Sequence, residues 1–207
     1  MRFSIIIPAH NSAGHIRKAL DSIKAQTFKD YELIIVCDSC TDDTAGVARE
    51  YGARVEEVEY HCDGPTRNRG IELAQGEYVL FLDDDDWWIH EYVLEMIDNR
   101  LRGEPYIDIL CFSFIFRHIG YATPIRRCNG QHWIACWCKC YRRSAIGGAR
   151  FSDITDGSAD VQFFQMMFGK GLTVINWDMP FYYYNYWRDD SISARITTDF
   201  RGRKGLL

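Results

Sequence analysis

Hydrophobic and polar positions form alternating blocks along the first half of this chain. Short apolar runs that end at turn residues are typical of buried strands, whereas apolar positions three and four residues apart indicate helices. Strands are expected at residues 3–8, 31–37, 54–60 and 77–82. Helices are expected between them: one capped by Asn11 and Ser12, one over 41–51 and one over 63–75. Such a β-α-β-α-β-α-β series predicts a parallel sheet covered on both faces.

The second half has a less regular pattern that is rich in aromatic residues. It predicts a helix over 89–101, a long strand over 107–117, a helix over 160–169 and closing strands at 172–177 and 181–187. The last strand carries four tyrosines and a tryptophan, which serve either as packing or as stacking surfaces for a ligand. No repeat or linker interrupts the chain, so we expect a single domain over residues 1–207.

The amino-acid composition limits the classes of protein to which this chain can belong. The chain has 207 residues, 47% of them hydrophobic, and a formal charge of −5, which fits a soluble domain and not a nucleic-acid binder. Its first apolar run is too short for a signal peptide, and no apolar run is long enough to span a bilayer. We expect a cytoplasmic protein. A basic run near the C-terminus is either a solvated tail or a contact with anionic lipid at the inner face of a membrane; it comprises Arg195, Arg201, Arg203 and Lys204.

Eight cysteines require a choice between disulfides, zinc ligands and inert thiols. Disulfides are not expected without an export signal. Cys136, Cys138 and Cys140 alternate as on one face of a strand, whereas zinc sites usually use cysteines separated by two to four residues. We therefore interpret them as small buried hydrophobic residues, with a zinc-organised interaction module as the alternative.

The acidic run 83–86 directly follows the apolar strand at 77–82. Four adjacent carboxylates repel one another, and a divalent cation with phosphate ligands would relieve that repulsion. The alternative is an acidic loop that caps the next helix. In parallel sheets ligands bind beyond the carboxyl ends of the strands, so residues 8–11, 38–41 and 83–86 are expected on one rim.

Four motifs in order carry a resemblance to a known family. Residues 4–11 (SIIIPAHN), 32–44 (ELIIVCDSCTDDT), 64–71 (GPTRNRGI) and 76–86 (GEYVLFLDDDD) resemble the successive signatures of family 2 glycosyltransferases, and 186–193 is similar to their closing segment. The resemblance implies the GT-A fold, a three-layer α/β/α sandwich with a mostly parallel central sheet. Residues 1–100 would form the donor half and 101–207 the acceptor half.

The resemblance also implies a nucleotide-diphosphate sugar over the strand ends. Mn²⁺ or Mg²⁺ on its diphosphate would be held by Asp83 and Asp85, and Asp38 would receive the base N–H of uracil. Asp38 is alternatively an Asx-turn residue. Cys37 stands where the family often has an acid, which bears on the choice of base. The remaining residues expected around the donor are Pro8, His10, Asn11, Asp84, Arg67 and Arg188.

Catalysis in inverting members needs one carboxylate that takes the proton of the acceptor hydroxyl. In the family's Glu-Asp pair the Glu is replaced here by Ala159, and the Asp is kept as Asp160, our candidate for the general base. Asp153 and Asp156 are the alternative candidates for the base. Asp160 could instead have a purely structural role, as an acid at the start of a helix that the helix dipole stabilises. The acceptor side is expected around Trp133, Trp137, Tyr141 and Arg142.

The resulting hypothesis is a metal-dependent inverting hexosyltransferase. It would move a sugar, with UDP-sugars favoured, to a hydroxyl of a glycan or lipid-linked glycan in cell-surface polysaccharide synthesis. A catalytically weak nucleotide-sugar-binding protein of the same fold is the alternative. A nucleotidyltransferase is disfavoured, because no glycine-rich phosphate loop follows the first strand. Nothing in the sequence indicates an oligomeric state.

Overall fold

A mixed nine-stranded sheet runs through the part of the chain that the computed structural model describes, residues 1–116, 126–128, 135–154 and 159–185. The strand order is β3-β2-β1-β4-β8-β6-β9-β5, with β7 beside β6. The strands are β1 (Phe3–Ala9), β2 (Tyr31–Asp38), β3 (Arg54–Val58), β4 (Tyr78–Phe81), β5 (Trp87–Trp88), β6 (Ile109–Phe116), β7 (Arg126–Cys128), β8 (Lys139–Arg142) and β9 (Val174–Tyr184).

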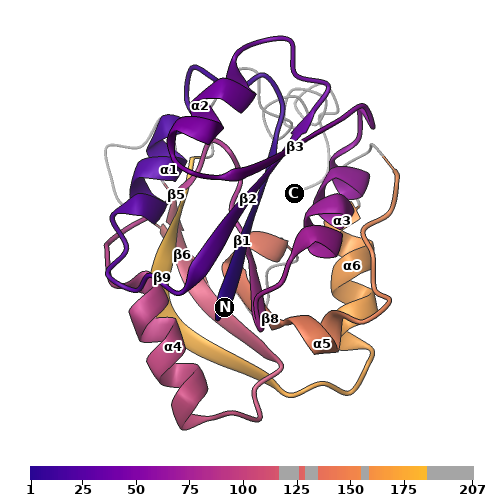
Figure 1. Cartoon of the computed structure of the whole chain (residues 1–207). Helices are drawn as coiled ribbons and strands as arrows, with labels where there is room; N and C mark the ends of the chain where they lie inside the picture. The colour runs from indigo at the N-terminus through magenta and orange to yellow at the C-terminus, as the bar shows by residue number, and fades with distance from the viewer. Residues whose placement is uncertain (117–125, 129–134, 155–158, 186–207) are drawn as a thin grey trace, which may run out of the picture.

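Helices cover both faces of the parallel half formed by β3, β2, β1 and β4. Figure 1 shows α1 and α4 on one side and α3, α5 and α6 on the other. This covering explains why every residue of β1 is buried and why its sequence is apolar without alternation. The predicted three-layer α/β arrangement is confirmed. The helices are α1 (Arg17–Lys24), α2 (Thr44–Glu50), α3 (Asp63–Leu73), α4 (Val93–Gly103), α5 (Arg143–Ile146) and α6 (Ala159–Phe168).

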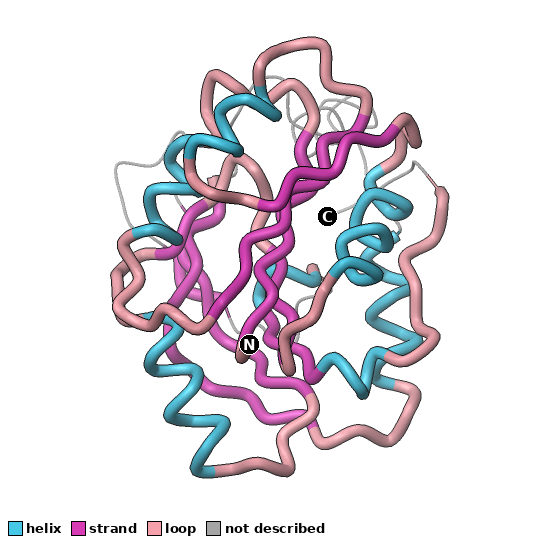
Figure 2. Tube along the Cα trace, viewed as in Figure 1, coloured by secondary structure: helices cyan, strands magenta, loops and turns pink. Residues whose placement is uncertain are grey.

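The chain changes direction across the sheet between β1 and β4. Strands β1, β2 and β3 are added outward in one direction, and β4 then returns to the free edge of β1. A crevice at the carboxyl ends of the strands is the usual ligand site where the strand order reverses in this way. Figure 2 shows the loops that follow β1 and β2 gathered at that end of the sheet.

The antiparallel half contains elements that were not predicted, β7, β8 and α5, and it differs from the sequence-based expectation in two further places. The two closing strands predicted at 172–177 and 181–187 form one strand, β9, whose pairing with β6 shifts register around Ser113. The helix predicted from residue 89 begins at Val93, because Trp87 and Trp88 pair with β9 as β5 instead. Trp87 also stacks on Tyr183 with ring centroids 4.1 Å apart. Both differences are long-range pairings that local periodicity does not encode.

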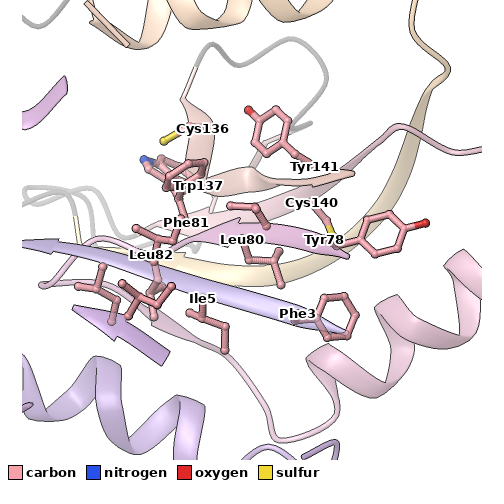
Figure 3. Close-up of a cluster of buried hydrophobic side chains, with 14 of the residues drawn as sticks. Phe3, Ile5, Tyr78, Leu80, Phe81, Leu82, Cys136, Trp137, Cys140 and Tyr141 are labelled. Atoms are coloured by element: carbon pink, nitrogen blue, oxygen red, sulfur yellow. The ribbon is translucent and has the colours of Figure 1, made fainter. Parts of the chain in front are cut away.

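The core joins the two halves of the sheet through large buried side chains. Figure 3 shows Phe3 and Ile5 from β1, Leu80 and Phe81 from β4, and Tyr141 from β8 within one cluster. Phe81 contacts the Tyr141 ring edge-on, with centroids 6.1 Å apart. None of the helices in the described residues is long and apolar enough to cross a membrane.

Close packing of α3 on β1 generates a first prediction. A Cβ atom at Gly70 would lie 2.3 Å from Cγ2 of Ile6, which is fully buried in β1. Gly70→Ala should lower the free energy of unfolding by about 1–3 kcal/mol, because the packed core cannot accommodate the extra methyl group. Urea unfolding would measure the loss. Gly103→Ala is the matched control, since no atom lies within 4 Å of a Cβ there. Equal effects at both positions would contradict this account of the packing.

Candidate active site

Strained backbone marks the rim at the carboxyl ends of the first three strands. Asn11, Ser39 and His61 are non-glycine residues with φ of 49°, 52° and 53°, and they lie in the loops after β1, β2 and β3. The left-handed conformation costs such residues about 1–3 kcal/mol each and is found where surrounding structure enforces it, often at functional sites. Three in adjacent loops therefore single out this rim.

Asp38 organises the outer part of the rim. Its carboxylate is 6% exposed and accepts hydrogen bonds from the backbone N–H groups of residues 60–62 at 2.7–2.9 Å and from the hydroxyls of Ser39 and Thr66 at 2.9 Å. Burial opposes ionisation, but these bonds outweigh it and lower the pKa of Asp38. Five donors occupy the roughly four lone-pair sites of a carboxylate, so a further N–H can bind only by displacing one of them.

Asn11 connects the loops after β1 and β2. Its side-chain oxygen accepts hydrogen bonds from the N–H and hydroxyl of Thr41 at 2.7 and 3.1 Å and from the N–H of Asp42 at 3.3 Å. The prediction that Asn11 and Ser12 cap the first helix is therefore wrong. Helix α1 begins at Arg17 without a side-chain cap, because Asn11 bonds to a neighbouring loop instead.

His10 brings the acidic loop to the same rim. Its backbone N–H donates to the Asp84 carboxylate at 3.3 Å, and its Nδ1 lies 2.7 Å from the carbonyl oxygen of Asp38. Pro8 is buried in β1 opposite Val36, two residues before His10. The predicted donor residues from three distant parts of the sequence are thus joined by direct hydrogen bonds.

A second group of predicted residues converges on Arg67. Its guanidinium donates to Asp83 at 2.7 Å and pairs with Asp63, and its side chain is 6% exposed. Burial acts to lower the pKa of Arg67, but the carboxylates of Asp83 and Asp160 raise it above its usual range. Arg67 is therefore a permanent cation between the acidic loop and the start of α6.

Asp160 has an acceptor atom that no described residue uses. The thiol of Cys136 hydrogen-bonds to its carboxylate, yet Oδ1 is buried with no hydrogen-bond partner in the part of the chain described. Nε of Arg67 is likewise buried with no hydrogen-bond partner among the described residues. Buried polar atoms are almost always bonded, so an unpartnered acceptor beside an unpartnered donor indicates a place for a polar ligand.

The sequence does not identify Cys136 as a site residue. Residues 136–138 form a 3-10 turn, η2 (Cys136–Cys138), and not the strand that the alternating cysteines suggested. Burial chiefly raises the pKa of the Cys136 thiol, which keeps its proton and donates to Asp160. No local signal in the sequence identifies this contact, because the pairing of β8 with β4 and β6 determines where η2 lies.

Tyr182 was also missed, because the sequence shows it only as one of several aromatics. Its hydroxyl donates to Asp86 Oδ2 at 2.5 Å and accepts from the backbone N–H of Asp83 at 3.2 Å. The N–H of Asn185 donates to the other oxygen of Asp86 at 2.7 Å. Asp86 is fully buried, and burial raises its pKa, with Asp85 and Asp83 adding to the effect. Asp86 therefore anchors the acidic loop to β9.

The acidic loop supplies the donors that a hard divalent cation prefers. Asp83 and Asp85 present carboxylate oxygens, the usual ligands of Mg²⁺ and Mn²⁺. No three acidic, histidine or cysteine side chains converge on one point within the described residues. Mg²⁺ is commonly held by one or two carboxylates together with substrate phosphates and water, so an incomplete protein set of this kind fits such a cation.

Other predicted residues lie elsewhere. Arg142 is beside Tyr78 at the start of β4, at the opposite end of that strand from Asp83, and it donates to the carbonyl of Ile107 at 2.9 Å. Tyr141 and Trp137 are buried in the core, so two of the four residues expected on the acceptor side contribute to packing, and Arg142 is ion-paired with Glu77 and Asp108. Asp153 is exposed. Arg188, Asp156, Trp133 and the closing segment 186–193 lie outside the described residues.

Comparison with known proteins adds an independent line of observation. The model of glycosyl transferase family 2 matches residues 4–147. The Bacillus subtilis protein EpsH is 29% identical over 209 residues, a match that covers 87% of this chain and 60% of EpsH. The chain therefore spans well under two thirds of that relative.

Solved structures resemble the fold closely. Staphylococcus aureus TarS 1–349 in complex with UDP-GlcNAc superposes with a TM-score of 0.76 at 22% identity, covering 91% of this chain and 59% of that one. The mannosyltransferase PcManGT from Pyrobaculum calidifontis, in complex with GDP-Man and Mn²⁺, gives a TM-score of 0.72 at 20% identity. The match covers 99% of this chain and 66% of PcManGT.

The Tyr182 contacts generate a second prediction. Tyr182→Phe keeps the ring but removes the donor to buried Asp86, and it should lower the free energy of unfolding by about 1–3 kcal/mol. Chemical denaturation would measure this. Tyr183→Phe is the control, since Tyr183 contributes a ring stacked on Trp87 and should change stability less. Similar losses in both variants would show that the hydroxyl of Tyr182 has no special role in holding the acidic loop.

Proposed function

This chain belongs to glycosyl transferase family 2, and from that premise we propose that it transfers a sugar from a nucleotide-diphosphate sugar to an acceptor hydroxyl with inversion. The structural match to TarS confirms the GT-A fold that the sequence motifs predicted. A UDP-sugar is the favoured donor, since TarS was solved with UDP-GlcNAc. The single observation that carries the proposal is the convergence of Arg67, Asp83 and Asp160, with Oδ1 of Asp160 unpartnered.

Asp160 is assigned the role of general base. An acceptor hydroxyl is a poor nucleophile until a carboxylate takes its proton, and the buried Oδ1, which has no partner among the described residues, would accept that hydrogen bond. As the acceptor oxygen bonds to the anomeric carbon, the bond from that carbon to the diphosphate oxygen breaks. The proton passes to Asp160. Arg67, a permanent cation beside Asp83, would stabilise charge that develops on the diphosphate.

Asp83 and Asp85 are the residues that would hold Mn²⁺ or Mg²⁺. When bound, the cation neutralises charge on the leaving diphosphate. Tyr182 and Asp86 position this loop, because one hydroxyl contacts both Asp86 and the backbone of Asp83. The Asp84 carboxylate is already engaged by the N–H of His10, which keeps the loop against β1.

The rim built by Asp38, Asn11, His10 and Pro8 would receive the nucleoside. Uracil N–H can bind Asp38 by displacing one of the five donors around its carboxylate, and the hydroxyls of Ser39 and Thr66 can rotate away, since Thr66 Oγ1 also lies 2.8 Å from the carbonyl oxygen of Cys62. Cys37 and not an acid stands next to it, so base selection rests on Asp38 alone among the predicted carboxylates. Arg188, which follows the aromatic strand in sequence, is assigned to the diphosphate, where a guanidinium would stabilise the developing charge.

The proposals for the acceptor and for the biological role are based on the names of related proteins. TarS is named as a poly(ribitol-phosphate) beta-N-acetylglucosaminyltransferase, so its name gives a poly(ribitol-phosphate) as the acceptor. We assign this chain, by analogy, to the synthesis of a surface glycan or lipid-linked glycan, at the cytoplasmic face of a membrane. Residues 1–100 would serve the donor and 101–207 the acceptor, within one domain.

Donor binding is tested with a panel of UDP-, GDP-, CDP- and dTDP-sugars, each with Mn²⁺ or with EDTA. A ligand that binds only the native state raises the melting temperature, so UDP-sugars with Mn²⁺ should stabilise the protein and EDTA should abolish the shift. Asp85→Asn should remove the Mn²⁺-dependent shift. If no nucleotide sugar shifts the wild type under either condition, the proposed donor site is wrong.

The general base is tested by Asp160→Asn. This isosteric change removes the proton acceptor, so transfer to a panel of glycan acceptors should fall at least about 100-fold while the UDP-sugar thermal shift remains. Asp153→Asn, on an exposed side chain, is the matched control and should keep wild-type turnover. Equal activity in wild type and Asp160→Asn would exclude Asp160 as the base. A wild type that binds the sugar but never transfers it would instead favour the nucleotide-sugar-binding alternative.

A further inference from the structure

Two cysteines meet at the point where β2 runs into the nucleotide-facing rim. Cys37 is the penultimate residue of β2 and Cys40 lies three residues later, across a turn that contains left-handed Ser39. Each thiol shifts the pKa of the other, which places the two side chains close together. Cys40 Sγ also lies 3.5 Å from the carbonyl of Ala9, the residue that pairs with Cys37 across β1 and β2. The turn thus holds both sulfur atoms against the same strand end.

The two thiols differ in the way that a redox-active pair requires. Cys40 is partly exposed, whereas Cys37 is 1% exposed. The contact with Cys37 lowers the pKa of Cys40 to about 7, with the N–H of Asn11 and the Thr44 hydroxyl contributing. The same contact with Cys40 raises the pKa of Cys37. An exposed thiolate reacts first with an oxidant, and a buried neighbouring thiol then resolves the adduct.

We propose that Cys37 and Cys40 are a modification site, oxidised to an intramolecular disulfide by a low-molecular-weight disulfide such as glutathione disulfide, and that oxidation weakens nucleotide binding. In the first step the Cys40 thiolate attacks the glutathione disulfide, forms a mixed disulfide and releases one glutathione thiolate. In the second, Cys37 passes its proton to the glutathione thiolate released in the first step, and its sulfur attacks Cys40 Sγ and releases the other glutathione thiolate, which takes a proton from water. Two protein thiols are oxidised and one glutathione disulfide is reduced to two glutathiones. A Cys-x-x-Cys pair beside a β-α-β unit is the spacing that permits this chemistry.

The effect on nucleotide binding follows from the contacts of Cys40 and rests on the proposed function. The backbone N–H of Asn11 donates to Cys40 Sγ at 3.4 Å. A disulfide requires the two sulfur atoms to lie about 2.05 Å apart, so closing it moves Cys40 Sγ relative to the N–H of Asn11. Thr41, the next residue, holds the side chain of Asn11 through two hydrogen bonds. Oxidation would therefore displace the two loops assigned to the nucleoside relative to each other.

The disulfide itself is tested without any nucleotide. Trypsin releases residues 30–49 as one peptide that contains Cys37 and Cys40 and no other cysteine. After glutathione disulfide treatment of the full chain, this peptide should be lighter by two hydrogen atoms and should regain them with dithiothreitol. In Cys37→Ala, Cys40 should instead retain a glutathione adduct. Cys62→Ser, which removes another partly exposed thiol, should leave the response intact. An unchanged wild-type peptide, or one that keeps only the adduct, overturns the proposal.

Nucleotide affinity is then measured by titrating UDP with Mn²⁺ into reduced and oxidised protein. The dissociation constant should rise several-fold on oxidation and recover on reduction, and in Cys37→Ala and Cys40→Ala the internal disulfide cannot form. A disulfide that leaves the affinity for UDP unchanged overturns the link to nucleotide binding. Failure of the reduced protein to bind UDP would count against the proposed function, whereas the peptide result would still decide whether the disulfide forms.

Discussion

Parallel pairing of β1 between β2 and β4 is the constraint on which the rest of the molecule depends. It aligns the carboxyl ends of strands that are far apart in sequence, so that the loops after them share one rim. The strand order reverses between β1 and β4, and the N–H of His10 reaches the Asp84 carboxylate at that point. Because β1 is buried along its whole length, this alignment is secured by the core itself.

Electrostatics explain how four adjacent carboxylates are tolerated at the end of β4. The structure gives three of them different partners: Arg67 for Asp83, a backbone N–H for Asp84, and a tyrosine hydroxyl with a backbone N–H for buried Asp86. An unpaired buried charge would be costly, and each of these contacts reduces that cost. The loop is thereby held in shape by protein contacts, while Asp83 and Asp85 remain assigned to a cation that the substrate would help to coordinate.

Strain and reactivity are concentrated at the same rim. Left-handed Asn11 and Ser39 lie in the loops after β1 and β2, and the N–H of Asn11 donates to Cys40 Sγ in the second of these loops. Asp38 draws the N–H groups of residues 60–62 inward, which brings the loop after β3 into contact with the same region. A displacement of one loop is therefore transmitted directly to its neighbours, and this is why a modification at Cys40 would be felt at Asn11.

The sequence by itself determined the alternation of strands and helices in the first half, the layered fold and the family, because hydrophobic periodicity and short motifs are local properties. It also placed Asp38, Asp83 and Asp160 at element ends. The tertiary structure alone decided that Asn11 bonds to Thr41 instead of capping α1, that Tyr182 anchors Asp86, and that Cys136 contacts Asp160. These contacts join residues 24 to 96 positions apart, and their formation depends on sheet pairing that no local pattern specifies.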